Sequence, residues 1–163
     1  MPTAKRSRTA TTPSPAATPV RNTFTSGVTL KTAGNQSVTA TDTATASITG
    51  SATVAVTPAV ADHLVFLQQP TDTPAGQTIS PVIVEVVDAF GNVETDDNSD
   101  TITLSIGANP GGGTLGGTLT VAVVNGIATF SDLSIDQAGD GYTLHAATAG
   151  LADADSAAFA ITV

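Results

Sequence analysis

Residues 82–92 read Val-Ile-Val-Glu-Val-Val-Asp-Ala-Phe-Gly-Asn and contain the clearest strand of the chain. Val82, Val84 and Val86 alternate with side chains that include Glu85. A period of two indicates a β-strand with one buried face, because successive side chains of a strand point to opposite sides. The Asp-Ala-Phe-Gly-Asn that follows is typical of a tight turn, in which the aspartate accepts backbone N–H groups and the glycine takes a positive φ.

The same pattern continues along the chain from residue 24 onward. Residues 101–106 alternate three apolar side chains with three hydroxyls, and Asn125-Gly126 offers the two positive-φ residues of a type I′ hairpin turn. The strands expected around that turn lie at 119–123 and 127–130. Further strands are expected at 63–67, 141–147 and 157–163. Short strands separated by turns over about 100 residues predict an all-β chain folded as a two-sheet antiparallel sandwich.

Composition excludes several classes of function. The 163 residues include no Cys, no Trp, one Tyr and two His, so disulfide frameworks, cysteine zinc sites and thiol catalysis are ruled out. Five Lys and Arg stand against 14 Asp and Glu, and all five cations lie within residues 1–31. Without a basic patch we expect no nucleic-acid partner, and without a long apolar stretch we expect no membrane insertion.

An internal repeat predicts how the chain is organised. Residues 24–34 match 130–139, and residues 51–56 match 156–161, an offset of 105 with single-residue slips at Gly27 and near Gln36. The predicted parts are a disordered tail at 1–22, the C-terminal third of a truncated repeat at 23–59, and a complete repeat at 60–163. Nothing in the tail resembles the apolar region of a secretory signal. We expect the partial repeat to be marginal alone, because it lacks a facing sheet.

Four motifs together resemble the immunoglobulin-like repeats of bacterial surface and secreted proteins, of the invasin, intimin and filamin-like kind. They are Leu64-Val-Phe66, Val84-Glu-Val-Val-Asp-Ala-Phe-Gly-Asn92, Asn125-Gly-Ile-Ala-Thr-Phe130 and Ala138-Gly-Asp-Gly-Tyr-Thr-Leu144. The resemblance covers residues 60–163 fully and 24–58 in part. It implies an immunoglobulin-like sandwich, neighbouring repeats as partners, a host or cell-surface ligand, and a location outside a bacterial cell. It implies no catalytic activity.

One tyrosine fits this architecture. Tyr142 stands two residues before Leu144, which is the spacing of a tyrosine corner, where the hydroxyl bonds to an upstream backbone group. Leu144 then occupies the position that antibody domains give to a cysteine. In the first copy Gln36 lies near the Tyr142 position, which weakens the corner there.

Oxygen-bearing side chains crowd into one short stretch and make it a candidate calcium site. Calcium takes six to eight oxygen ligands, and carboxylates with no nearby cation lose their mutual repulsion when they bind one. The alternative is a solvated acidic loop that keeps the chain soluble. A more scattered acidic group at Asp132, Asp136 and Asp140 is a weaker candidate. The candidate ligands are Asp88, Asn92, Glu94, Asp96, Asp97 and Asp100.

Catalysis is not expected. His145 has no activating partner visible in the sequence, Asp153 and Asp155 read as turn residues, and the glycine-rich 109–117 lacks the lysine of a phosphate-binding loop and reads as a flexible connection. The predicted function is a non-catalytic spacer, stalk or adhesion module. The alternatives are an accessory carbohydrate- or ligand-binding module of a secreted hydrolase, which the scarcity of aromatic residues disfavours, and a calcium-stiffened linker.

Overall fold

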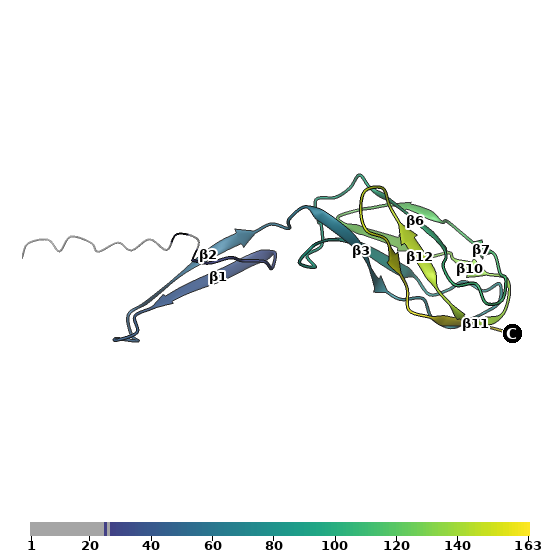
Figure 1. The fold of residues 1–163 in the computed structure, drawn as a ribbon, viewed down its shortest axis with the longest axis horizontal. Coiled ribbons are helices and arrows are strands. Elements are labelled where there is room, and N and C mark those ends of the chain that lie inside the picture. The colour runs from purple at the N-terminus through teal and green to yellow at the C-terminus, as the bar shows by residue number, and fades with distance from the viewer. Residues whose placement is uncertain (1–24, 26) are drawn as a thin grey trace, which may run out of the picture.

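The computed structural model describes residue 25 and residues 27–163, and it is all-β. The tail expected at 1–22 lies outside the described residues. A two-stranded hairpin, β1 (Gly34–Thr41) and β2 (Thr49–Val56), extends from one end of a β-sandwich built by the residues from β3 onward (Figure 1).

The sandwich has two layers of mainly antiparallel strands. In one layer β5 lies between β3 and β9; in the other β12 lies between β13 and β6 with β8 beyond, and β14 lies between β11 and β4. Only Thr143 separates β11 from β12, so the two parts of the second layer are consecutive. A short β7–β10 pair lies apart. The bounds are β3 (Ala61–Gln68), β4 (Thr73–Pro74), β5 (Val82–Asp88), β6 (Thr101–Ile106), β7 (Leu115–Gly116), β8 (Thr120–Ala122), β9 (Ile127–Phe130), β10 (Ser134–Ile135), β11 (Gly139–Tyr142), β12 (Leu144–Ala147), β13 (Ala154–Asp155) and β14 (Phe159–Thr162).

The alternating residues fill the space between these layers, as predicted. Val82, Val84 and Val86 are fully buried on β5, and Ile102 and Leu104 are buried on β6, while the hydroxyl side chains of β6 face solvent. The alternation sets which side of a strand meets the core, although β5 buries both faces at its end, where Val86, Val87 and Asp88 are all buried. The other side chains of this core cluster are Leu64, Phe66, Ile79, Val123, Ala128, Phe130, Leu133, Ile135, Tyr142, Leu144, Ala146, Phe159 and Ile161.

The tyrosine corner is present. The Tyr142 hydroxyl donates to the Gln137 carbonyl at 3.0 Å, and the ring is fully buried beside Phe159. The glycine-rich connection packs against this ring, because a Cβ added at Gly113 would lie 2.9 Å from the Tyr142 oxygen and one at Gly111 would collide with it. These glycines therefore serve close packing, where the sequence predicted only a flexible connection.

The Asn125-Gly126 turn is also as predicted, with φ of 51° and 79° and a Val124 N–H to Ile127 carbonyl bond of 2.9 Å. The strands on either side nevertheless separate beyond the turn. β8 pairs with β6 in one layer and β9 pairs with β5 in the other. Val124 and Ile127 form a single bridge across the turn, so the turn carries the chain from one sheet to the opposite sheet.

The β1–β2 hairpin has the register of a hairpin inside the sandwich. Gly34 pairs with Val56, and Gly139 on β11 pairs with Ile161 on β14, each 105 residues further along. β11 contains a bulge between Asp140 and Tyr142 that β1 lacks, which coincides with the slip seen in the sequence near Gln36. The domain boundaries drawn from the repeat stay a prediction.

Candidate functional site

The turn that follows β5, residues 88–92, is called the junction turn below. Asp88 at its start is buried, although it is a carboxylate. One of its oxygens accepts the N–H groups of Phe90 at 2.8 Å and Asn92 at 2.9 Å. The other accepts the N–H of Ala59 at 2.9 Å and the Asn92 side-chain amide at 2.8 Å. Groups of this chain therefore satisfy both oxygens.

These contacts set the charge state of Asp88. Burial by itself raises the pKa of this carboxyl, but donation from the Asn92 side chain and from the N–H groups of Ala59, Asn92 and Phe90 outweighs it and holds the pKa well below its usual range. Asp88 is ionised at neutral pH, and its charge is held by donors rather than by a cation.

Asp88 contacts Ala59, which follows β2, and Asn92 contacts residues 31–33, which precede β1; these two segments are called the hairpin base. Asn92 Oδ1 accepts the Ala33 N–H at 2.8 Å, and its Nδ2 donates to the Lys31 carbonyl at 2.7 Å. The Lys31 ammonium lies 5.1 Å from the centre of the Phe90 ring, within reach of a cation–π interaction. The junction turn therefore holds the chain both where it enters the hairpin, at 31–33, and where it leaves, at Ala59.

The remaining calcium candidates lie in the loop after the turn. Asp97 Oδ1 accepts the N–H groups of Ser99 and Asp100. Burial, and then the charges of Asp88, Asp96 and Asp97, raise the pKa of Glu94, while burial and Asp97 raise the pKa of Asp100. These carboxylates repel one another at neutral pH.

Two atoms of that loop are buried without a hydrogen-bond partner among the described residues, Glu94 Oε1 and Asp97 Oδ2. Residues 25 and 27–163 nevertheless contain no group of three or more His, Asp or Glu side chains arranged to hold a metal ion. Two of the six candidates, Asp88 and Asn92, are committed to the hairpin base. Calcium at the remaining carboxylates stays a prediction.

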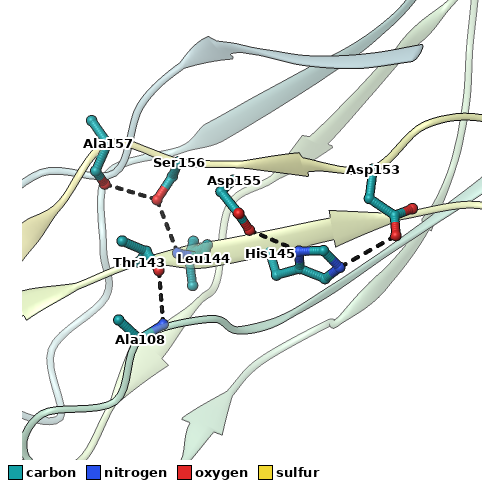
Figure 2. Close-up of polar contacts among 8 residues, drawn as sticks. All are labelled: Ala108, Thr143, Leu144, His145, Asp153, Asp155, Ser156 and Ala157. Carbon is teal, nitrogen blue, oxygen red and sulfur yellow. Dashed lines mark hydrogen bonds and ion pairs between the residues drawn. The ribbon is translucent and has the colours of Figure 1, made fainter. Parts of the chain in front are cut away.

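His145 has partners that its sequence context did not reveal. Its Nδ1 lies 2.7 Å from Asp155 and its Nε2 lies 3.5 Å from Asp153, as Figure 2 shows. The hydrogen bond to Asp155 is the main cause that raises the pKa of the imidazole from its ordinary value of 6.5. His145 meets Asp155 because β12 pairs with β13 in the register that places these two residues opposite each other. The sequence does not show which strands pair, so this contact could not be predicted from it.

The nearby Ser156 is not placed as a nucleophile. Its hydroxyl accepts the Leu144 N–H at 2.9 Å and donates to the Ala157 carbonyl at 2.8 Å (Figure 2). The two nitrogens of His145 face carboxylates instead of this hydroxyl. The contacts of Ser156 and His145 therefore join β12 to residues 153–157.

The second acidic group has separate structural tasks. Asp132 accepts the N–H and the hydroxyl of Thr118, and these bonds lower its pKa. Asp136 accepts the Thr114 N–H, and Asp140 is exposed. Asp136 therefore anchors the glycine-rich connection, and Asp132 anchors Thr118, the residue that follows it.

Within the part of the chain that the structure describes, no pocket is present and no helix has the length and apolar character needed to cross a membrane. The feature that joins the segments flanking the β1–β2 hairpin to the sandwich is the junction turn.

No known family and no curated protein matches the chain. Two solved structures of Parabacteroides merdae beta-glucuronidase are similar in part. One has 18% identity and a TM-score of 0.43 over 66% of this chain and 14% of that chain. The other, with glycerol in its active site, has the same identity and TM-score over 76% of this chain and 16% of that chain. The match thus spans less than a fifth of the enzyme's length.

Proposed function

We propose that this chain is a non-catalytic, immunoglobulin-like spacer of a bacterial surface or secreted protein, in which the junction turn holds one β-unit to the next. The observation that carries the proposal is the contact of Asp88 and Asn92 with the backbone of residues 31–33 and 59. Side-chain atoms of Asp88 and Asn92 form hydrogen bonds with main-chain atoms both before β1 and after β2. Such a contact restricts bending between two units, which is what a stalk requires.

The remaining parts of the proposal rest on the resemblance of the four sequence motifs. Neighbouring repeats would be the permanent partners, a host or cell-surface ligand would bind elsewhere in the parent protein, and the location would be outside the cell. The shortage of exposed aromatic side chains supports a spacer over a sugar-binding module, since Phe90 is the one aromatic among the exposed large apolar residues of the described chain.

Spin-label distances test the junction. The chain has no cysteine, so Ser51→Cys on the hairpin and Ser105→Cys on β6 accept labels at unique sites. We expect a narrow distance distribution in the labelled parent and a clearly broader one after Asn92→Ala, because the bonds to Lys31 and Ala33 are lost. Asn98→Ala is the matched control, since that amide bonds to Asp96 and Asn125 instead.

An Asn92→Ala distribution as narrow as the parent's would contradict a junction held by this turn. Specific binding in a sugar-array screen would instead favour the accessory module of a hydrolase.

A further inference from the structure

The β1–β2 hairpin has one apolar and one polar face. Directly paired residues of an antiparallel hairpin lie on the same face, and alternate pairs share that face. The apolar face consists of Gln36, Val38, Ala40, Ala52, Val54 and Val56, and the polar face of Asn35, Ser37, Thr39, Thr41, Thr49, Ser51, Thr53 and Ala55. Val54 is 42% exposed, and Val38 and Val56 are half-buried. Because β1 and β2 pair only with each other, no second sheet of the described chain encloses this face.

The sandwich contains a hairpin, formed by β11 and β12 with β13 and β14, that matches this one at Gly139↔Ile161 and is shifted beyond the bulge at Gly141. Val54 and Val56 correspond to Phe159 and Ile161, which are 4% and 2% exposed. Beyond the bulge at Gly141, the residues of β1 correspond to positions one further along, so Val38 matches Leu144 and Ala40 matches Ala146. Leu144 and Ala146, which lie on β12, are fully buried. Val38, Ala40, Val54 and Val56 of the apolar face therefore have counterparts in the core, whereas Ala157, the counterpart of Ala52, is exposed.

The structure also shows what covers the buried hairpin. The inner face of the β3–β5–β9 sheet lies opposite it, β6 pairs with the edge of β12, and β4 pairs with the edge of β14. These elements all come from residues 60–130. Neither β1, β2, β4 nor β6 contains a charged residue, so charge does not oppose the same contacts at the first hairpin, although the chain has a net charge of −9.

We propose that the apolar face of β1–β2 is a docking surface for a segment equivalent to residues 60–130, supplied by another immunoglobulin-like unit. The three-stranded sheet of that segment would cover Val38, Val54 and Val56. Its β6 would pair with the edge of β1 and its β4 with the edge of β2. This goes beyond the spacer function, because a spacer could carry this hairpin uncovered.

An extended chain tests the proposal. Residues 60–129 of this chain are placed directly before Phe24, in place of residues 1–23, and the rest of the chain is unchanged. Amide hydrogen exchange is then measured in β1 and β2. We expect these amides to exchange at least about 100-fold more slowly than in the parent, because a covered hairpin opens only when the unit unfolds.

Four controls accompany the extended chain. Val54→Asp on the apolar face should abolish the new protection, whereas Thr53→Asp on the polar face should leave it in place. Amides of β12, which occurs once in the parent and once in the extended chain, should stay protected in both and show that the complete sandwich is folded. A tandem duplicate of residues 60–163 shows that the added segment folds when its own hairpin follows.

The proposal is overturned if β1 and β2 exchange as rapidly in the extended chain as in the parent while the tandem duplicate is protected. It is also overturned if the parent's hairpin becomes protected as protein concentration rises, since the occupant is then a second copy of the hairpin. Either failure leaves the spin-label test of the junction intact, because that test uses the chain without the added segment.

Discussion

The two hairpins of this chain share part of a register but not an environment. β1–β2 has no second sheet packed on its apolar face, where Val54 is exposed and Val38 and Val56 are half-buried, whereas the β11–β14 region forms half of a core. Where the first hairpin has Gln36, Val38 and Val54, the second has Tyr142, Leu144 and Phe159. Strand pairing can thus be set locally, while burial requires a facing sheet, and the second hairpin has the larger side chains that fill the space between sheets.

The largest expected effect comes from removing core volume in one hairpin only. Leu144→Ala should lower the free energy of unfolding by about 3 kcal/mol, because a fully buried leucine leaves a cavity. Val38→Ala at the corresponding position should change it by less than about 0.5 kcal/mol. Urea unfolding followed by the fluorescence of Tyr142, the only Tyr of the chain, reports on the sandwich in both variants. Equal losses would remove the distinction between the hairpins.

A smaller effect is expected at the tyrosine corner. Tyr142→Phe keeps the ring but removes the bond to the Gln137 carbonyl, so the free energy of unfolding should fall by about 1 kcal/mol. Gln36→Ala, at the corresponding position of the first hairpin, should leave sandwich stability unchanged. Circular dichroism during urea unfolding measures both, since the first variant has no tyrosine. A neutral Tyr142→Phe would show that the hydroxyl bond adds nothing to the corner.

The smallest effect concerns charge in the loop after the junction turn. Because the pKa of Glu94 is raised in the fold, its ionised form destabilises the fold as pH rises above the ordinary value of 4.5. Glu94→Gln should therefore stabilise the sandwich at pH 7 by roughly 0.5 kcal/mol and give no gain at pH 4. Asp42→Asn in the hairpin turn should do neither. A gain for Glu94→Gln that is the same at both pH values would contradict the burial and repulsion of an ionised Glu94 as the cause.

The same loop allows a test of the calcium prediction. A bound cation would raise the thermal midpoint of the parent chain in millimolar calcium at matched ionic strength, and Asp96→Ala with Asp97→Ala would remove that rise. An equal response to sodium at the same ionic strength would show screening alone and would contradict the prediction.

Part of the candidate site could be anticipated from the sequence. Asp88 and Asn92 stood out as oxygen-bearing residues, and the role of Asp88 in its own turn followed from the local motif. Their long-range contacts could not be read, because the partners Ala59 and Ala33 lie 29 and 59 residues away. His145 and Asp155 are similar, since they meet only through strand pairing.

The sequence by itself determined the strands with one buried face, the Asn125-Gly126 turn, the tyrosine corner and the match between the hairpins. These features depend on neighbours within a few residues or on a repeated pattern, both of which are written along the chain. Only the tertiary structure decided that β8 and β9 enter opposite sheets, that the glycine-rich connection packs on Tyr142, and that the junction turn forms hydrogen bonds with the hairpin base. Those outcomes require segments far apart in the chain to meet, and side-chain alternation does not specify which segments do so.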